Sequence, residues 1–464
     1  MDFYQLRVHF IGIGGIGVSG LARFLKAQGA IVSGSDIKDT SITQTLRDEG
    51  IAINIPHNKE VIADKDLIIH SAIIKDSNIE IIESKRLNKE ILSRKEALKI
   101  LLSKKRVLSI CAAHGKSSTS AILAAILPHS GAIIGAISKE FNSNVRVSKD
   151  DLLVFEADES DKSFLNSNPY KSIVINAEAE HLESYDNDFK KLQDAYLSFM
   201  QQGQQVVLNM QCEILQNLYV RLKDSGFKSS AITCLYPDID IQNITYELKD
   251  LLPYTTFTLK DLGRFSIYGI GYHNALNASI AVLSAMDLLP LEEIKNNLLA
   301  FKGIKKRFDI LQNLSDNTPC IIDDYAHHPT EIVATLEATR KYAKLLEAQK
   351  VLKKDSKNSY KITAIFQPHK YSRLRDNLKA FCKCFKDCDR LVILPVWAAG
   401  EEPINFDFAT LFSEYKPIFA SKVKRDKEKI LLLDSKNCVI ETLSEGIIIG
   451  LGAGDITYQL RGEQ

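Results

Sequence analysis

A lysine in a glycine-containing turn is the residue of this sequence best placed to bind a phosphate. Lys116 follows Gly115 and precedes two serines, after a short apolar run. The pattern is typical of a strand, a phosphate loop and a helix, because a helix that begins at a tight turn directs unpaired N–H groups toward an anion. Lys116 would contact the terminal phosphates of a nucleotide, and the Ser117 hydroxyl would face Mg²⁺. The strict motif is not met, because Ile110 stands where a glycine is required, so an ordinary strand-to-helix turn is the alternative.

A run of acidic residues follows the apolar segment 152–155. Its members are Glu156, Asp158, Glu159 and Asp161. Such a concentration of negative charge is costly unless a cation neutralises it, and hard carboxylate oxygens suit Mg²⁺. A solvated acidic turn is the alternative. A second expected strand, 172–176, delivers further candidates, which are Glu178, Glu180 and His181.

A second glycine-rich turn lies near the N-terminus. Gly12, Gly14 and Gly17 fall between an expected strand at 6–10 and an amphipathic helix at 18–28, and Asp36 follows the next expected strand. This is the dinucleotide-binding arrangement, which indicates a bound phosphate more strongly than it identifies the nucleotide. An NAD(P)-dependent oxidoreductase is therefore one hypothesis.

The loop around Lys116 resembles that of the Mur ligases, ATP-dependent enzymes that form amide bonds in peptidoglycan precursor synthesis. The family usually has Gly-Thr-His-Gly-Lys-Thr-Thr, and this chain has Ala112-Ala113-His114-Gly115-Lys116-Ser117-Ser118. The resemblance implies that these residues bind ATP. Ala112 replaces a glycine, so the loop must accommodate a methyl group close to the phosphates.

The N-terminal turn is similar to the part of the same family that holds the diphosphate of a UDP-sugar. On that resemblance the turn binds UDP-N-acetylmuramate and not NAD(P). The residues implied in UDP-sugar binding are Gly12, Gly14, Gly15, Gly17, Asp36 and Ser71. Ser71 lies in an expected strand, 67–73, with Asn78 and Glu80 beyond it.

The resemblance also implies a catalytic metal and an adenine site. Mg²⁺ would be held by Ser117, Glu156 and His181, with Lys116, His181 and Glu156 as the catalytic residues. Glu180 stands where the family usually has Asp. ATP would be contacted further by His273, Asn274, Asn277, Arg307 and Asp324. A His-Asn pair at a helix start is also typical of a helix cap, and Lys306 beside Arg307 replaces an arginine that the family usually has.

Two motifs near the C-terminus resemble the family's site for the amino-acid acceptor. They follow expected strands at 320–325 and 362–366, and the residues implied are Tyr325, His327, Lys370 and Arg373. L-alanine is the expected acceptor, because a small pocket with a cation selects a free amino acid. Lys370 replaces a usual arginine, which should weaken bidentate binding of the carboxylate. Ala326 is more like the family member that adds an intact tripeptide during recycling, which is the alternative.

Length and charge bound the architecture. The 464 residues suggest about three domains, and 59 basic against 58 acidic residues give a net charge of +1, so no overall field attracts nucleic acid or a membrane. We expect a cytoplasmic α/β protein without membrane insertion, a monomer or weak homodimer. Its domains would be 1–92, a Rossmann-like UDP-sugar domain, 93–307, a P-loop ATPase-like mixed sheet, and 308–464, a Rossmann-like acceptor domain.

Three further segments give expectations without an assigned function. Residues 91–104 predict a helix leading into the second domain, and 347–360 predicts a helix extension with a surface loop. A helix over 371–385 would place Cys384 and Cys388 on one face, without Cys382. Packed thiols are favoured over a metal site, since no second cysteine pair lies nearby.

Overall fold

The computed structural model describes residues 3–160, 162–179, 182–315, 318–349 and 361–463. The chain forms two compact units, one made of residues 1–243, 257–265 and 275–302 and the other of residues 244–256, 266–274 and 303–464. Two large sheets belong to the first unit and one to the second, which together give an α/β protein of three domains. The expected domain bounds at 92 and 307 remain a prediction.

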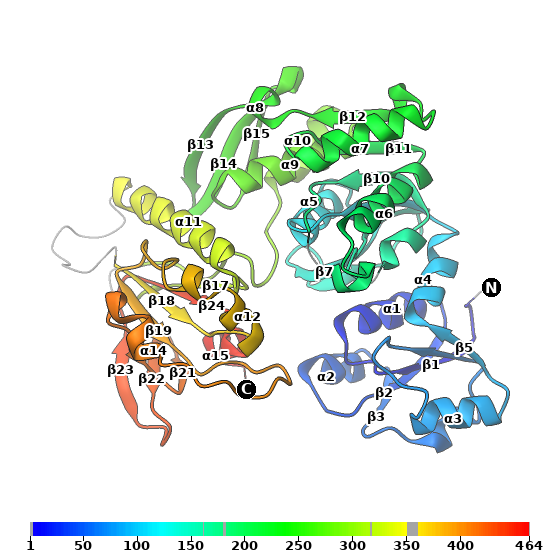
Figure 1. Cartoon of the computed structure of the whole chain (residues 1–464), viewed down its shortest axis with the longest axis horizontal. Coiled ribbons are helices and arrows are strands. Elements are labelled where there is room, and N and C mark those ends of the chain that lie inside the picture. The colour runs from blue at the N-terminus through cyan, green and yellow to red at the C-terminus, as the bar shows by residue number, and fades with distance from the viewer. Residues whose placement is uncertain (1–2, 161, 180–181, 316–317, 350–360, 464) are drawn as a thin grey trace. The chain divides into compact units, whose positions relative to one another are not determined.

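The N-terminal sheet is fully parallel, in the order β3-β2-β1-β4-β5 (Figure 1). Its strands are β1 (Arg7–Ile11), β2 (Ile31–Ser35), β3 (Ala52–Asn54), β4 (Leu67–His70) and β5 (Glu90–Ser93), with helices α1 (Ile16–Ala27), α2 (Ser41–Asp48) and α3 (Ile79–Arg86). The strand order reverses between β1 and β4. In such sheets a ligand binds beyond the carboxyl ends of the strands at this point.

The central sheet has seven strands, in the order β12-β11-β10-β6-β9-β7-β8, and only β8 pairs antiparallel. The strands are β6 (Arg106–Cys111), β7 (Gly131–Ser138), β8 (Ser143–Arg146), β9 (Leu152–Glu156), β10 (Pro169–Val174), β11 (Gln205–Asn209) and β12 (Ile232–Leu235). The helices are α5 (Lys116–Ile126), α6 (Phe189–Gln202), α7 (Glu213–Asp224) and α8 (Pro237–Asp240). A small sheet follows, of β13 (Ile241–Lys249), β14 (Leu252–Leu259) and β15 (Arg264–Tyr268), and then α9 (Tyr272–Ala285) and α10 (Leu291–Leu299).

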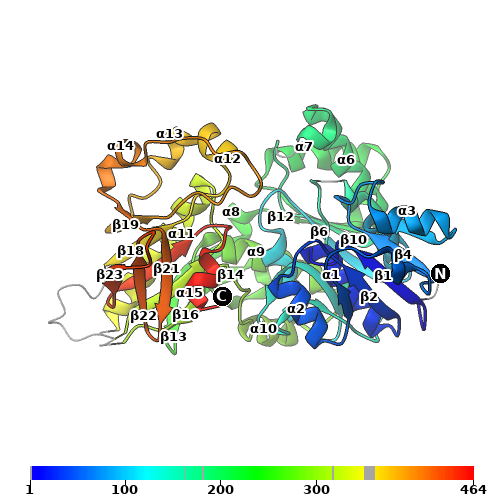
Figure 2. The same ribbon diagram turned by 90° about the horizontal axis from the view of Figure 1, so that it is seen from below.

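The second unit is built on a six-stranded sheet in the order β16-β17-β24-β18-β19-β20, parallel except for β16. Its strands are β16 (Asp309–Gln312), β17 (Cys320–Asp324), β18 (Ile362–Phe366), β19 (Arg390–Ile393), β20 (Ile418–Phe419) and β24 (Ile447–Leu451). Helix α11 (Pro329–Ala348) follows β17. An antiparallel sheet of β21 (Lys422–Asp426), β22 (Lys429–Leu433) and β23 (Val439–Leu443) packs against α15 (Ile456–Arg461) (Figure 2).

Alternation along the central strands of this third sheet builds two separate cores. Ile321, Ile365 and Ile448 belong to one apolar cluster, while their neighbours Ile322 and Ile449 belong to another. Successive side chains of a strand point to opposite faces, so a continuous apolar run fills both layers of a covered parallel sheet.

Two expected helices are wrong in part. Residues 90–93 form β5 and pair with β4, and the helix begins only at Arg94, as α4 (Arg94–Leu102). Ser93 and Glu96 form a capping box that fixes this start. The expected helix 371–385 is divided into α12 (Tyr371–Asp376) and α13 (Leu378–Phe381), with the break at Asn377.

The cysteines near residue 385 follow these helices, so the expected shared helical face does not exist. Cys384 is buried in the apolar cluster, and its thiol lies 3.3 Å from the Phe381 carbonyl oxygen. Cys388 is half-buried and lies 3.1 Å from the Phe385 carbonyl oxygen. Within the described ranges, no group of three or more His, Cys, Asp and Glu side chains is placed to hold a metal ion. These contacts support packed thiols.

Some predictions fall on residues that the structure does not describe. His181, Glu180 and Asp161 are among them, as are residues 350–360, whereas α11 extends to Ala348. Of the helices that are described, none combines the length and the apolar character needed to cross a membrane.

Candidate active site

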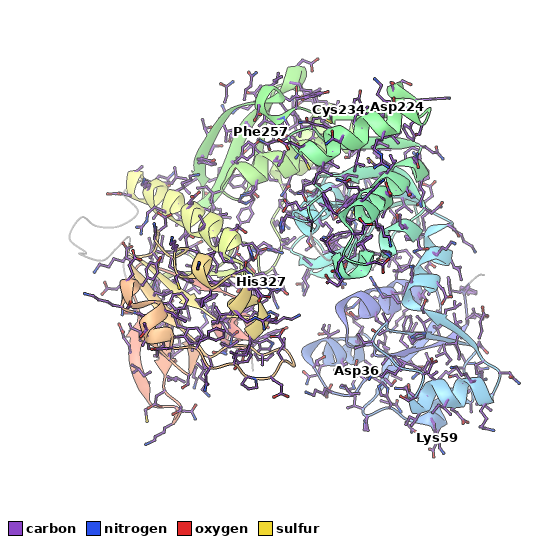
Figure 3. All side chains as sticks on the ribbon, viewed as in Figure 1. Asp36, Lys59, Asp224, Cys234, Phe257 and His327 are labelled. Atoms are coloured by element: carbon purple, nitrogen blue, oxygen red, sulfur yellow. The ribbon has the colours of Figure 1, made fainter. Side chains whose placement is uncertain are left out.

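The N-terminal glycine turn connects β1 to α1 and folds against two other strand ends. Gly12 has φ +80°, and a Cβ there would lie 3.1 Å from that of Ser71, which follows β4. The Gly14 amide donates to Asp36 Oδ2 at 2.8 Å, and Asp36 follows β2 (Figure 3). Gly15 caps α1, and Gly17 lies in its first turn. The structure thus brings the predicted UDP-sugar residues together, with Asp36 holding the turn in shape.

Arg94 is a residue of this region that sequence reasoning missed. Its guanidinium carbon lies 2.8 Å from the position of a Cβ on Gly17, so a side chain at position 17 would displace the guanidinium. Arg94 Nε is buried and has no hydrogen-bond partner within the described part of the chain. An unpaired guanidinium beside a glycine turn fits an anion such as a diphosphate. It lies in the segment 91–104, for which the sequence predicted a helix without an assigned function.

The phosphate loop lies between β6 and α5. Gly115 has φ +84°, and a Cβ there would lie 3.1 Å from Asn277 Oδ1. Lys116, the first residue of α5, donates from Nζ to the Ala112 carbonyl at 2.5 Å. Ala112 is fully buried, so its methyl group is accommodated. His114 exchanges two backbone bonds with the Asn176 side chain, at 3.0 and 2.9 Å, which fixes the loop to the end of β10.

Glu159 is the ionic partner of Lys116. Both of its carboxylate oxygens lie 2.8 Å from Lys116 Nζ, and the residue is 2% exposed. Burial opposes the charge of Lys116, but the attraction of Glu159 outweighs it and raises the pKa of the ammonium. Burial also raises the pKa of Glu159, with Lys116 opposing. The sequence indicated an acidic run here, without indicating which member pairs with the lysine.

Glu156 and Ser117 form the part of the expected metal site that the structure describes. Ser117 Oγ donates to Glu156 Oε1 at 2.8 Å, and the Gly135 amide donates to Oε2. Burial raises the pKa of Glu156, more than these bonds and the nearby Lys116 lower it. A hydroxyl and a desolvated carboxylate in contact at a helix N-terminus are the hard oxygen donors that Mg²⁺ takes beside phosphate and water. The donor set therefore fits this ion.

The residues expected around adenine lie on the first turns of α9. His273 and Asn274 are in contact, with 3.2 Å between His273 Nε2 and Asn274 Nδ2. Asn277, one turn later, is 5% exposed and lies against Gly115 as described above. Asn277 therefore lies beside the phosphate loop.

In the second unit, Asp324 ends β17 and organises the chain around it. It accepts bonds from the amides of Phe308 at 2.7 Å and Ala326 at 2.8 Å. Burial raises its pKa to about 6, although Arg307 partly offsets this. The Arg307 guanidinium in turn lies 5.3 Å from the centre of the Tyr325 ring. Asp324 thus positions the loops that carry Arg307 and Tyr325.

The predicted acceptor residues come from loops after β17 and β18, two strands that flank β24. The ring centres of Tyr325 and His327 are 5.1 Å apart, and those of His327 and His369 are 5.8 Å apart. Arg373 Nη1 lies 3.0 Å from His369 Nδ1. Tyr325, His327 and Arg373 therefore form one cluster with His369. Lys370 binds the Trp397 carbonyl through its backbone amide at 2.9 Å.

The fold is that of the Mur ligases. The profile of the Mur ligase family, catalytic domain, matches residues 7–106. The crystal structure of a UDP-N-acetylmuramate–alanine ligase from Thermotoga maritima has a TM-score of 0.77 and 24% identity, covering 98% of this chain and 97% of the other. A murein peptide ligase from Psychrobacter arcticus has a TM-score of 0.61 and 17% identity, covering 97% and 96%. These two structures establish the fold.

Relatives in sequence show to which group of Mur ligases the chain belongs. A UDP-N-acetylmuramate–L-alanine ligase of Helicobacter pylori is 54% identical over 463 residues, 100% of this chain and 98% of the relative. One from Campylobacter curvus is 50% identical over 456 residues, 98% and 99% of the two chains. The chain belongs to the family of UDP-N-acetylmuramate–L-alanine ligases.

Proposed function

We propose that this protein joins L-alanine to the lactyl carboxylate of UDP-N-acetylmuramate with hydrolysis of ATP, in peptidoglycan precursor synthesis. The observation that carries the proposal is the 54% identity to an L-alanine ligase over the whole chain. Family membership also argues against the NAD(P)-dependent oxidoreductase that the N-terminal turn alone allowed.

The reaction has two steps. An oxygen of the lactyl carboxylate attacks the γ-phosphorus of ATP, ADP leaves, and an acyl phosphate forms. The neutral amine of L-alanine then attacks the acyl carbon, so that a C–N bond forms and the bond to phosphate breaks. The products are an amide, ADP and phosphate.

The loop around Lys116 would stabilise the charge that moves during the first step. Lys116 and the N-terminal amides of α5 are donors that a γ-phosphate requires, and Ala112 to Ser118 would surround the phosphates. Ser117 and Glu156, with His181, would hold Mg²⁺, which neutralises phosphate charge when bound. His273, Asn274 and Asn277 would contact adenine. Arg307 and Asp324 complete the proposed ATP contacts.

The other two substrates are assigned to the other two sheets. The turn from Gly12 to Gly17, with Asp36, Ser71 and Arg94, would bind the UDP-sugar, and Tyr325, His327, Lys370 and Arg373 the acceptor. The proposed domains are accordingly 1–92, 93–307 and 308–464. Closure of the third domain would exclude water from the acyl phosphate.

We place this reaction in the cytoplasm, where ATP is made and nucleotide-activated sugars are available. A net charge of +1 supports neither nucleic acid nor an anionic membrane as a partner. The protein would act as a monomer or weak homodimer.

The proposal is tested by phosphate release from ATP, with UDP-N-acetylmuramate, Mg²⁺ and one acceptor at a time. L-alanine should support turnover, and glycine and L-serine should do so less well, because one small group discriminates by about 1–3 kcal/mol. Turnover with L-alanyl-γ-D-glutamyl-meso-diaminopimelate, the peptide named for a ligase of the same fold, but not with L-alanine would overturn the assignment. A fluorescence change with NAD(P)H would instead support the oxidoreductase.

A further inference from the structure

In the acceptor cluster, the Nδ1 atom of one histidine faces a hydrogen-bond acceptor, and the Nδ1 atom of the other faces a hydrogen-bond donor. His327 Nδ1 lies 2.8 Å from the backbone carbonyl oxygen of Tyr325. His369 Nδ1 lies 3.0 Å from Nη1 of Arg373. The two rings are neighbours, with 5.8 Å between their centres.

These partners fix the position of the proton on each ring. A carbonyl oxygen only accepts, so His327 Nδ1 must carry the hydrogen, and the neutral ring has its lone pair on Nε2. A guanidinium only donates, so His369 Nδ1 must accept and its hydrogen lies on Nε2. Of the two rings, His327 therefore has a basic nitrogen at Nε2 that can take up a proton, whereas Nε2 of His369 already carries a hydrogen.

The surroundings of His327 favour its neutral form. Burial lowers the pKa of His327, and the cations Arg373 and Arg307 lower it further, against the opposing effect of Glu331. Burial and Arg373 lower the pKa of His369 to about 4, with smaller contributions from His327 and Lys370 and an opposing one from Glu401. Both rings are then neutral at pH 7.

The His327 ring is oriented and its second nitrogen is free. Glu331 Oε2 lies 3.6 Å from His327 Nδ1 and also accepts from the backbone amides of His327 and His328, which holds this loop against α11. Within the described part of the chain, Nε2 of His327 makes no hydrogen bond, and the side chain is 17% exposed. Figure 3 labels His327 in the loop that follows β17.

We propose that Nε2 of His327 is the catalytic base that accepts the proton of the acceptor amine as the amide forms. One proton of the L-alanine ammonium passes to Nε2, and the neutral amine so formed gives its electron pair to the acyl carbon. The bond to phosphate breaks with its pair on the phosphate oxygen, and the departing phosphate takes the second proton of the nitrogen. This inference rests on the proposed function and adds the base that the sequence does not identify.

The test uses His327→Asn in the full-length protein, because the asparagine amide can still donate to the Tyr325 carbonyl. L-alanine-dependent phosphate release should fall by at least about 100-fold, the usual contribution of general base catalysis. Hydroxylamine is an uncharged nucleophile at pH 7 and needs no base, so hydroxamate formation from UDP-N-acetylmuramate and ATP should stay within about threefold of wild type.

The pH profile separates a base from a merely structural residue. Wild type should lose kcat/KM for L-alanine as the pH falls through the pKa of His327 and should level off above it. The kcat/KM of His327→Asn should instead keep rising about tenfold for each unit of pH increase across the neutral range, because only the small neutral fraction of the amine then reacts. His369→Asn, which keeps an acceptor for Arg373, should retain the acid limb of wild type. An equal loss of hydroxamate in His327→Asn, or an unchanged acid limb, would overturn the inference.

Failure of the proposed function would look different. In that case wild type itself would not use L-alanine, and the same comparison would be made with the tripeptide, whose amine needs the same proton removed.

Discussion

At the scale of single residues, Arg94 is a candidate anion-binding residue that its sequence context conceals. The side chain carries a charge, lies beside Gly17 and has a buried Nε without a partner in the described structure. A bound diphosphate would satisfy it through charge-assisted hydrogen bonds.

We predict that Arg94→Ala raises the KM for UDP-N-acetylmuramate by about 10- to 100-fold and leaves kcat within about threefold, because a bond to a charged group contributes roughly 1.5–3 kcal/mol. Arg94→Lys should recover part of the loss. Lys95→Ala, at the exposed neighbouring position, is the control and should leave both KM and kcat unchanged. A fall in kcat at unchanged KM would argue against diphosphate binding.

Glu156 leads to a prediction about the metal. Glu156→Gln keeps the size of the side chain and can still accept from Ser117, but it removes the negative charge that a divalent cation requires. The Mg²⁺ concentration for half-maximal phosphate release should rise at least about tenfold. Titration of Mg²⁺ measures this, with the exposed Glu213→Gln as the matched control, and an unchanged requirement would remove Glu156 from the metal site.

The sequence identified most of the candidate site, but not the contacts inside it. Lys116, Ser117 and Glu156 are recognisable because a loop and a strand end impose a local spacing. Glu159 and His369 take their roles from neighbours distant in sequence, Lys116 and His327 respectively. Such pairings depend on how strands are ordered in a sheet, which no local pattern contains.

At the scale of helices and strands, the predicted bounds were accurate where the apolar residues follow a single clear pattern along the chain. Strand β18 has the expected bounds, and β17 begins at the expected residue. The errors fall where charges and apolar residues alternate ambiguously, as at β5, or where a single side chain ends a helix. Asn377 donates to the Arg373 carbonyl at 3.1 Å and divides α12 from α13. The sheet β21–β23 was not predicted at all.

One ion pair ties α9 to the central sheet. Lys171 on β10 is 2% exposed and donates to Asp287 Oδ1 at 2.6 Å and to the Ser284 carbonyl at 2.8 Å. Removing Asp287 leaves the buried charge of Lys171 without a partner, which is costly. Replacing Lys171 with an apolar residue leaves no buried charge. The two partners should therefore respond unequally to substitution.

We predict that Asp287→Ala lowers the free energy of unfolding by about 2–3 kcal/mol, less than for a fully buried pair, since solvent reaches Asp287. Lys171→Met should stay within about 1 kcal/mol. Burial favours the neutral Asp287 carboxyl, but the bond from Lys171 outweighs it and lowers the pKa. The contribution is therefore complete above about pH 4 and is lost as the pH falls through the lowered pKa.

Urea unfolding at pH 7 and at acidic pH measures both effects. The matched control is Lys191→Ala, which breaks the exposed Lys191–Asp186 pair and should cause no measurable change. Equal losses for Asp287→Ala and Lys171→Met at neutral pH would contradict the argument.

At the scale of the whole molecule, the three large sheets place their candidate residues in the same way. In each, the candidate residues follow the carboxyl ends of neighbouring parallel strands: β1 and β4, β6 and β9, and β17 and β18 on either side of β24. Parallel strands require crossover connections, so their carboxyl ends collect loops at one edge. The division of the chain into three such sheets could be predicted from the alternation of strands and helices.

This division predicts that substrates bind independently. Lys116→Ala should abolish ATP-dependent phosphate release, because the γ-phosphate loses its cation, while UDP-N-acetylmuramate, which we assign to the other sheet of the first unit, should bind within a few-fold of wild type. At 100 times its Kd the sugar nucleotide should still add about 2.7 kcal/mol to stability, measured as a shift in Tm.

Glu159→Gln gives a second check on the separation of the two sites. This variant retains Lys116, and UDP-N-acetylmuramate should raise its Tm by the same amount as in wild type. Lys99→Ala, an exposed lysine of α4, should behave as wild type in both assays, and a parallel loss of sugar binding in Lys116→Ala would contradict the separation of the two sites.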